Sequence, residues 1–375
     1  MAIIQPFRAL RYNLKTLKEL NNVVCPPYDI INKELKINLI KSSKYNYIHI
    51  ELPDSYSDAK KSLTQWLNKK ILIQDKNDSI YIFQQKFGSK IRTGFFCLLK
   101  LDEKYIIKHE HTSQKPIEDR LNLLKTLKID TSPIFVIALD EKNLIHKKLK
   151  NIISKTKYDI KFEFENIKNF LWCISDKKVI DELKRILEKQ HLLIADGHHR
   201  FQTSIIYKNE IDNKKEYIMT YICSANDPGL CILPTHRVVK FSPEIQNNIN
   251  KYFNLTTWDK EKTSKIVYYK SGEFYTLKLK NKYKEYINLP CVCLLHELIL
   301  KEINVGDIFY TKDIQEAIKL TNTSQLNYSG IAFLLEAPSI KSIFYRSKAG
   351  KIFPHKSTYF YPKVPSGVVI HSFND

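Results

Sequence analysis

The sequence predicts a protein of the α+β class, with mixed β-sheets and packed helices. Segments with the alternating pattern of strands and segments with the periodicity of helices are interspersed along the 375 residues. Hydrophobic residues make up 43% of the chain, which is enough to bury a sizeable core. We expect two packed units: a catalytic α+β region over residues 1–240 and a C-terminal α+β region over residues 241–375.

The first predicted elements come before residue 140. Residues 47–53 alternate like a strand, and residues 58–70 have the pattern of a helix with an apolar inner face. Residues 79–87 and 92–101 have the pattern of a hairpin. Residues 132–139 form a tight apolar run, which is typical of a buried strand.

The later elements follow the same logic. Residues 192–195 are apolar and short like a buried strand, and residues 201–207 have the mixed apolar pattern of a helix packed against it. Residues 266–269 and 274–277 suggest a hairpin about Gly272. Residues 294–303 have the spacing of an amphipathic helix.

A dense polar cluster separates the strand at 192–195 from the helix at 201–207. Its members are Asp196, Gly197, His198, His199 and Arg200. A strand-to-helix turn at Gly197 exposes N–H groups at the positive end of the helix dipole, which favours an anion. Arg200 adds a planar, two-pronged donor for the same anion.

Asp196 has the wrong charge to touch a phosphate directly. A carboxylate at this position is better suited to hold a metal ion, a substrate hydroxyl or a neighbouring imidazole. A plain structural interpretation stays open, in which Asp196 caps the helix and the two histidines are solvated.

A second cluster contains His109, Glu110 and His111, and Arg120 follows in a helix that opens near Asp119. The cluster comes after apolar residues, as at a strand end that leads into a pocket. Glu110, between two imidazoles and near several cations, should stay ionised and could accept a proton from a substrate hydroxyl. The alternative is a surface turn with interleaved charges.

A third cluster joins a turn at Asp227 to His236 and Arg237 at the edge of a strand-like run. Near the end of the chain, residues 353–363 contain Lys356 among hydroxyls and aromatic rings. This segment could clamp a phosphate or stack a base, or it could be an aromatic edge strand bounded by prolines.

Composition limits the class of protein. The net charge of +20 comes from lysines spread along the whole chain, so we expect a solvated surface and no specific nucleic-acid site. Arginine supplies only 8 of the 60 basic residues, and three of the eight lie in the clusters above. The seven scattered cysteines suggest reduced core thiols. The absence of a signal peptide or a long apolar run suggests a cytoplasmic protein.

Several motifs in order resemble the bacterial and archaeal family called domain of unknown function 1015. They comprise Pro27-Tyr28-Asp29, His109-Glu110-x-Thr112, Asp119-Arg120, Ser132-Pro133-Ile134-Phe135, Ala195-Asp196-Gly197-His198-His199-Arg200, Pro234-Thr235-His236-Arg237 and Pro354-x-Lys356-Ser357-Thr358-Tyr359-Phe360. The Asp-Gly-His-His-Arg core also resembles the phosphate-binding box of the ParB and sulfiredoxin superfamily. That superfamily includes nucleotide-dependent kinases that act on free serine.

The second resemblance implies a ParB/sulfiredoxin-like core elaborated by further α/β segments. It implies that Gly197, His198, His199 and Arg200 bind nucleotide phosphates, and that a small alcohol such as serine attacks the terminal phosphate of ATP or ADP with Mg²⁺ present. Glu110 is then the expected base, with His109 beside it, and Asp196 is either the competing base or a ligand to Mg²⁺. Four further residues would bind the remaining phosphates or the substrate carboxylate: Arg120, His236, Arg237 and Lys356.

Two other functions stay open. A metal-dependent hydrolase of a small phosphoester could use four histidines as ligands: His109, His111, His198 and His199. Their spacing lacks the i, i+4 pattern of a dedicated zinc motif, and the nearby arginines fit phosphate better than metal. A non-catalytic protein that binds nucleotides or nucleic acid is the other possibility, and it receives weak support from the charge.

Overall fold

The computed structural model describes residues 1–260 and 265–373 and comprises two compact units. Unit 1 consists of Met1–Lys108, Thr112–Leu230 and Pro362–Asp375, and unit 2 consists of His109–His111 and Cys231–Tyr361. The division after Leu230 comes earlier than the expected boundary at residue 240, because the strands that follow Leu230 pair with strands of unit 2. That the units are independently folding domains stays a prediction.

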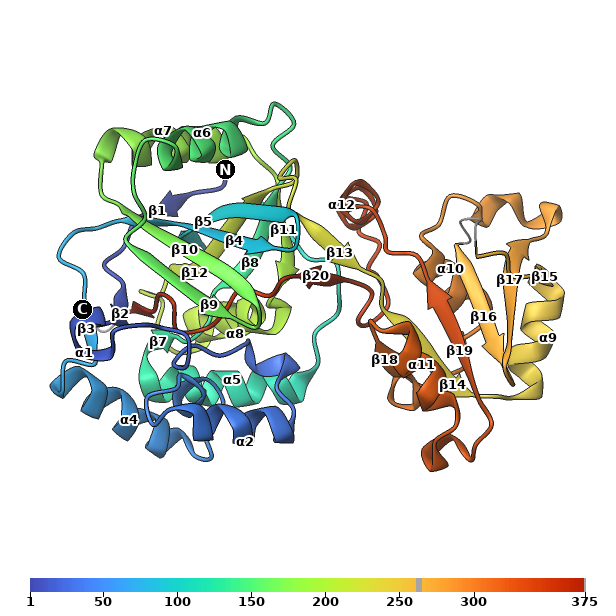
Figure 1. Ribbon diagram of the computed structural model, residues 1–375. Helices are drawn as coiled ribbons and strands as arrows, with labels where there is room; N and C mark the ends of the chain where they lie inside the picture. Colours follow the sequence, from blue (N-terminus) through green and yellow to red (C-terminus); the bar gives the residue numbers. More distant parts are fainter. Residues whose placement is uncertain (261–264, 374–375) are drawn as a thin grey trace. The chain divides into compact units, whose positions relative to one another are not determined.

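Unit 1 is built on a mixed sheet, with nine strands among the described residues (Figure 1). The strands are β1 (Ile4–Gln5), β4 (Ile80–Phe87), β5 (Lys90–Lys100), β6 (Ile106–Ile107), β8 (Ile134–Ala138), β9 (Ile160–Phe164), β10 (Ile167–Ile174), β11 (Leu192–Asp196) and β12 (Tyr217–Ser224). Their order is β6-β11-β8-β12-β5-β4-β10-β9, and β1 pairs with β5. The pairs β6–β11 and β8–β12 are parallel, and the other pairs are antiparallel.

Helices lie on both sides of this sheet. They are α1 (Leu14–Leu17), α2 (Lys33–Ser42), α3 (Ile48–Glu51), α4 (Tyr56–Asn68), α5 (Gln114–Leu127), α6 (Leu144–Ile153), α7 (Lys177–Glu188), α8 (His198–Glu210) and the short 3₁₀ helix η1 (Tyr28–Ile30). Figure 1 shows α6 and α7 on one side of the sheet and α2, α4 and α5 on the other. Apolar side chains of α6 and α7, among them Leu149 and Leu183, pack into the main hydrophobic core with Ile82, Phe95 and Val136 of the sheet.

The C-terminal segment of unit 1 is anchored at several points. Ser366 N donates to Cys25 O at 2.8 Å, and Ile370 N donates to Leu10 O at 3.0 Å. Two short pairs complete the unit: β2 (Leu10–Tyr12) with β3 (Leu72–Gln74), and β7 (Ile129–Asp130) with β21 (His371–Ser372). These contacts fix the course of the segment that carries Lys363.

Unit 2 has a sheet in which all described pairs are antiparallel. Its order is β15 (Phe253–Thr257), β17 (Glu273–Leu279), β16 (Ile266–Lys270), β19 (Gly330–Leu335), β14 (His236–Lys240) and β18 (Phe309–Thr311), and β13 (Cys231–Leu233) pairs separately with β20 (Tyr359–Tyr361). Its helices are α9 (Pro243–Tyr252), α10 (Cys291–Leu298), α11 (Ile314–Thr321), α12 (Ile340–Lys348), and the 3₁₀ helices η2 (Asn281–Tyr286), η3 (Val305–Asp307) and η4 (Ser324–Leu326). A small core joins α11 to the sheet through Ala317, Val238 and Ala332.

Most predicted elements are confirmed. The hairpin β4–β5, the buried strand β8, the strand β11 with its following helix α8, and the hairpin β16–β17 all form where the sequence pattern placed them. The aromatic edge-strand interpretation of residues 353–363 is confirmed in part, because β20 pairs with β13. The described chain forms no disulfide, and its seven cysteines are free, as expected.

Three predictions of elements were wrong. Residues 47–53 contain the one-turn helix α3 instead of a strand, because the Asn46 side chain accepts from Ile48 N at 2.9 Å and so caps a turn. Helix α5 begins at Gln114, so Asp119 and Arg120 lie within it and not at its start. The helix expected at 294–303 begins at Cys291, directly after Pro290, and ends at Leu298.

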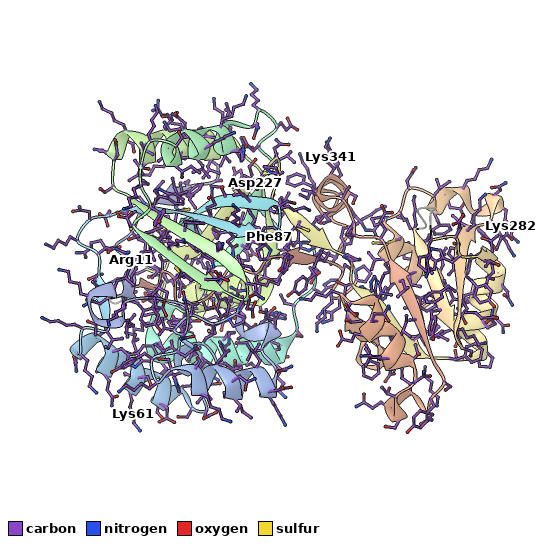
Figure 2. The ribbon with its side chains drawn as sticks, viewed as in Figure 1. Arg11, Lys61, Phe87, Asp227, Lys282 and Lys341 are labelled. Carbon is purple, nitrogen blue, oxygen red and sulfur yellow. The ribbon has the colours of Figure 1, made fainter. Side chains whose placement is uncertain are left out.

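Charged residues cover much of the surface of each unit. Lys61 in unit 1, and Lys282 and Lys341 in unit 2, are exposed, as Figure 2 shows. Within residues 1–260 and 265–373, no helix combines the length and the apolar character that crossing a membrane would require.

Candidate phosphate site

The structure divides the predicted site residues between the two units. Unit 1 holds six of them: Arg120, Asp196, Gly197, His198, His199 and Arg200. Unit 2 holds the other five: His109, Glu110, His236, Arg237 and Lys356. Each group has its own set of contacts.

The strand-to-helix turn in unit 1 has the predicted form. β11 ends at Asp196, Gly197 adopts a left-handed conformation with φ +91°, and α8 begins at His198. Gly197 provides no side-chain cap for the helix. A Cβ at this position would lie 3.1 Å from Arg200 Cζ and 3.2 Å from Arg200 Nε. The guanidinium of Arg200 therefore lies directly against Gly197 at the helix N-terminus, where an anion is favoured.

Replacing Gly197 tests whether its close approach to Arg200 matters. We expect Gly197→Ala to lower the free energy of unfolding by about 1 kcal/mol from the left-handed backbone alone, and by more because of the tight contact with Arg200. Gly272→Ala is a matched control, since Gly272 also has φ +91° but the described residues leave open space around its Cβ position. If chemical denaturation gives equal losses of unfolding free energy for Gly197→Ala and Gly272→Ala, the contact with Arg200 does not contribute.

Asp196 lies between two cations. Its Oδ2 accepts from Arg200 Nη2 at 2.5 Å, and its Oδ1 forms a close ion pair with Lys363 Nζ. The three side chains are about nine-tenths buried, with exposed fractions of 9% for Arg200 and 11% for Asp196 and Lys363. Arg200 Nη1 donates to Pro133 O, and Arg200 Nε is buried with no hydrogen-bond partner among the described residues.

These ion pairs govern the protonation of Asp196. Burial alone would raise its pKa, but Lys363 and Arg200 together lower the pKa to about 2. Asp196 therefore stays ionised at neutral pH and is a weak base. Both of its oxygens face cations, so the structure gives Asp196 a role in holding Lys363 and Arg200 in place.

The same ion pairs predict a pH dependence of stability. The folded pKa of Asp196, about 2, lies below the ordinary value of 3.8, so the contribution is complete above about pH 5 and is lost as the pH falls toward 2. The expected loss is roughly 2 kcal/mol. Chemical denaturation between pH 5 and pH 2 should show a shallower decline for Asp196→Asn than for the wild type. Parallel declines would mean that Asp196 is not ion-paired in the folded protein.

Asp29 brings a second carboxylate to this cluster. It lies in η1, directly after the rigid Pro26-Pro27 turn, and is exposed. The protein atoms around its carboxyl raise its pKa, and the charge of Asp196 raises it further, while Lys363 and Arg200 lower it. A carboxyl with a raised pKa beside two cations is suited to accept a proton.

Arg120 has structural partners. Its Nε donates to Asp119 Oδ2 at 2.8 Å, its Nη1 donates to Glu51 O at 2.7 Å, and its Cζ lies 4.2 Å from the centre of the Tyr28 ring. Glu51 is fully buried, and its Oε1 accepts from Ser132 Oγ at 2.5 Å. Arg120 therefore connects α5 to the Tyr28-Asp29 turn.

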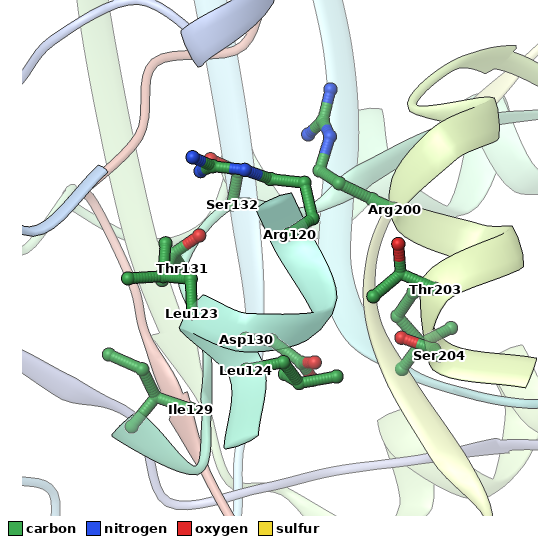
Figure 3. A pocket seen from close by; sticks show the side chains of 11 residues that line it. Arg120, Leu123, Leu124, Ile129, Asp130, Thr131, Ser132, Arg200, Thr203 and Ser204 are labelled. Atoms are coloured by element: carbon green, nitrogen blue, oxygen red, sulfur yellow. The ribbon is translucent and has the colours of Figure 1, made fainter. Parts of the chain in front are cut away.

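A small pocket of about 30 Å³ lies beside Arg120 and Arg200 (Figure 3). Its lining comes from α5, α8, β12 and the residues around β7: Arg120, Leu123, Leu124, Ile129, Asp130, Thr131, Ser132, Arg200, Thr203, Ser204 and Ile218. Four of these side chains carry hydroxyl groups. In Figure 3 the two arginines and Ser132 lie in the upper part of the view and Ile129 in the lower part.

The histidines of α8 are held differently. His198 is buried, with 8% exposed, and its positive form would stabilise the Asp196 carboxylate. His199 Nε2 lies 3.1 Å from Ser113 N, which donates to it, and therefore contacts the residue before α5.

In unit 2, Glu110 holds the segment around Ser357. Its Oε1 accepts from Ser357 N at 3.1 Å and from Thr358 Oγ1 at 3.3 Å, and it lies 3.6 Å from His109 Nε2. His109 is fully buried and its Nε2 lies 2.9 Å from Thr358 Oγ1. These contacts fix Glu110 as a support for the loop before β20.

Arg237 and His236 serve the interior of unit 2. Arg237 is fully buried and donates to the carbonyls of Thr235, His355 and Lys356, and burial lowers its pKa to about 10. His236 Nδ1 accepts from Leu335 N at 3.1 Å, and burial lowers the pKa of His236 to about 4. His236 is therefore neutral at pH 7 and does not provide a positive charge for phosphate.

Lys356, a predicted site residue of unit 2, is exposed. It has a left-handed backbone with φ +49°, and its Nζ lies 5.7 Å from the centre of the Tyr310 ring. Among the five predicted residues of this unit, Lys356 has the position best suited to contact a ligand.

The four histidines of the hydrolase interpretation are divided between the units. His109 and His111 belong to unit 2, and His198 and His199 belong to unit 1. In the part of the chain that the structure describes, no group of three or more histidine, cysteine, aspartate or glutamate side chains could hold a metal ion.

Sequence reasoning missed Arg92, and it noted Asp29 without assigning it a role. It included Lys363 in the segment 353–363 that could clamp a phosphate, but it did not pair Lys363 with Asp196. Lys363 is far from Asp196 in the sequence, and one lysine among many carries no local signal. Arg92 lies in a strand-like run, but the scarcity of arginine could have singled it out in the same way as Arg120 and Arg200.

The chain belongs to the family described as "Protein of unknown function (DUF1015)", whose model matches residues 4–300. This confirms the family resemblance seen in the motifs. No curated protein matches the sequence.

Several solved structures are similar to this chain at 12% sequence identity. SbnI with a C-terminal truncation from Staphylococcus aureus has a TM-score of 0.45, with 73% of this chain and 86% of that chain covered. A free serine kinase in complex with AMP has a TM-score of 0.38, with 71% and 86% covered. A conserved hypothetical protein from Pyrococcus furiosus has a TM-score of 0.39, with 74% and 95% covered.

Proposed function

We propose that this protein is a phosphotransferase that moves a phosphate group from ATP or ADP to the hydroxyl of a small metabolite. Free L-serine is the first acceptor to test. One observation carries the proposal: the N-terminus of α8 opens at a left-handed Gly197, beside the buried, unpaired Nε of Arg200 in the described part of the chain. Backbone N–H groups and a guanidinium together form a site for phosphate. The motif's resemblance to a ParB/sulfiredoxin-like phosphate-binding box supports the same assignment.

The reaction proceeds without a covalent enzyme intermediate. The acceptor oxygen forms a bond to the terminal phosphorus of the nucleotide, and the bond from that phosphorus to the bridging oxygen breaks. The products are the phosphoester and the nucleotide shortened by one phosphate. The hydroxyl proton passes to a carboxylate, and the cations of unit 1 stabilise the charge on the transferred group.

Asp29 is the proposed proton acceptor. Its carboxyl belongs to the same unit as the phosphate site, and the protein atoms around it and the negative charge of Asp196 raise its pKa above the ordinary value of 3.8. Asp196 is less suited to this role because its pKa is about 2. Glu110 remains the base predicted from the sequence, although its Oε1 already accepts two hydrogen bonds.

Asp196 does not fit the predicted role of a Mg²⁺ ligand, because Lys363 and Arg200 occupy its two oxygens. No step is therefore assigned to a metal ion at Asp196. The hydrolase alternative is less well supported, because the described residues contain no group of three or more histidine, cysteine, aspartate or glutamate side chains that could hold a metal ion.

Nucleotide binding tests the proposal directly. Calorimetric titration of the purified protein with ATP and with ADP should give saturable binding. The affinity should fall at least tenfold in Arg200→Lys, which keeps the charge but loses the planar fork. Arg185→Lys is the control, because Arg185 is exposed on α7. Absence of binding by the wild type, together with stoichiometric zinc or manganese in the purified protein, would favour the hydrolase instead.

A further inference from the structure

Arg92 is a buried cation without a counter-ion. It lies on β5, its exposed fraction is 0%, and no carboxylate of the described residues forms a salt bridge with it. Its Nη2 donates to Gln85 Oε1, whereas Nε and Nη1 are buried without a hydrogen-bond partner in residues 1–260 and 265–373. The guanidinium carbon lies 4.7 Å from the centre of the Phe135 ring and 5.5 Å from that of Tyr221.

This arrangement is costly for folding. An unpaired guanidinium removed from water loses several kcal/mol of solvation, and each cation–π contact returns about 0.5–2 kcal/mol. An apolar side chain would fill the same space between two aromatic rings without that cost. The positive charge of Arg92 therefore requires an explanation beyond packing.

Gln85 connects Arg92 to the C-terminal segment. Gln85 and Arg92 are opposite each other on the paired strands β4 and β5. Because Arg92 donates to Oε1, the amide nitrogen of Gln85 faces the other way, where Nε2 donates to Lys363 O at 3.2 Å and to Asn169 Oδ1 at 3.2 Å. Arg92 thus sets the orientation of an amide that holds the main chain of Lys363.

Lys363 is held at both ends. Its carbonyl accepts from Gln85, and its ammonium group pairs with Asp196, one residue before the glycine that opens α8. Lys363 and Arg200 therefore place two nearly buried cations around the Asp196 carboxylate. Two cations beside the N-terminus of α8 suit a group that carries more than one negative charge.

We propose that Lys363 is a catalytic cation that contacts the transferred phosphate, and that Arg92 is a positioning residue that acts through Gln85. The proposal rests on the phosphotransferase function proposed above. Lys363 Nζ keeps its three protons throughout: it shares them between Asp196 and the phosphate oxygens, so no bond to Lys363 forms or breaks. Arg92 does not touch the substrate.

Gln85→Glu separates positioning from folding. The substitution preserves size and gives Arg92 a counter-ion, so we expect a thermal unfolding temperature equal to or above that of the wild type. It also replaces the N–H donor to Lys363 O with an acceptor, which releases that carbonyl. We expect turnover with ATP or ADP and L-serine to fall about tenfold, while the affinity for ADP changes less than threefold.

The test is a double-mutant cycle with Lys363→Met. Lys363→Met alone should lower turnover about 10²-fold, as loss of one group that stabilises charge in the transition state typically does. Gln85→Glu added to Lys363→Met should cause less than a further twofold loss, because its effect passes through Lys363. If Lys363→Met does not fold, Lys363→Arg replaces it in the cycle. We expect the turnover of Lys363→Arg to lie between that expected for Lys363→Met and that of the wild type. Lys341→Met, at an exposed position of α12, is the control.

The outcomes distinguish this inference from the proposed function. If the wild type turns over and the turnover of Lys363→Met is within twofold of the wild-type value, this inference is overturned and the proposed function is not. Equal losses from Gln85→Glu in both backgrounds would show that Arg92 and Gln85 do not act through Lys363. A wild type with neither turnover nor nucleotide binding would overturn the proposed function and this inference together.

Discussion

Replacing Arg200 by methionine should lower phosphotransfer about 10³-fold, since loss of a donor that stabilises developing charge costs 10²–10³-fold in comparable sites. Arg200 holds Asp196 through Nη2, and its buried Nε lies against Gly197 at the N-terminus of α8. Initial rates with saturating ATP or ADP and L-serine measure this effect.

A structural contribution of Arg200 must be separated from the catalytic one. Removing one partner of a buried ion pair costs about 3–5 kcal/mol of stability, so Arg200→Met could unfold the protein. Arg200→Lys keeps the charge on Asp196, and we expect it to fold and still lose at least tenfold in turnover. Arg185→Met at the exposed surface of α7 controls for the loss of a positive charge. Full activity in folded Arg200→Lys would contradict a phosphate-binding role.

Replacing Asp29 by asparagine should lower turnover 10²–10⁴-fold, which is the usual contribution of a general base. Asparagine preserves the size of the side chain and removes the proton acceptor. In the wild type, turnover should fall on the acidic side as Asp29 becomes protonated. Because its pKa is raised above the ordinary value of 3.8, this fall should begin at a higher pH than for an ordinary aspartate. Asp29→Asn should lose that limb of the pH profile.

Glu110→Gln decides between the two candidate bases. If Asp29 accepts the proton, Glu110→Gln should lose less than tenfold, since Glu110 mainly supports Ser357 and Thr358. Glu302→Gln, at an exposed position of unit 2, is the matched control. A loss of 10²-fold or more in Glu110→Gln, with Asp29→Asn near wild type, would place the base at Glu110 as the sequence predicted.

Local sequence patterns predicted much of this fold, but they did not predict contacts between residues that are distant in the sequence. The β4–β5 hairpin follows from its alternating residues, and the turn at Gly197 follows from a glycine between a strand and a helix. The helix at Ile48–Glu51 was missed because the hydrogen bond from Ile48 N to Asn46 Oδ1 turns the chain locally and outweighs the alternation of residues 47–53.

The candidate site was predicted only where its residues are neighbours in sequence. Asp196 and Arg200 are four residues apart across the turn at Gly197, so their proximity could be foreseen. Lys363 reaches Asp196 only because the last segment of the chain returns to unit 1, which no local pattern indicates. The same return explains why Asp196 is ion-paired on both oxygens and is not open to a metal ion.

Arg237 illustrates the opposite error. An arginine in a lysine-rich chain does mark planar recognition, as predicted, but its partners are three main-chain carbonyls and the His296 ring of its own unit. Rarity of a residue type therefore identified a position with demanding geometry without distinguishing a ligand from the protein backbone.

The most direct test of the central claim is phosphorus NMR of the purified protein incubated with Mg²⁺, free L-serine, and ATP or ADP. The account predicts that a phosphoserine resonance grows with time, that AMP or ADP accumulates in equal amount, and that folded Arg200→Lys produces the signal at least tenfold more slowly. A wild-type sample that binds neither nucleotide and forms no phosphoester with L-serine or with other small alcohols would contradict it.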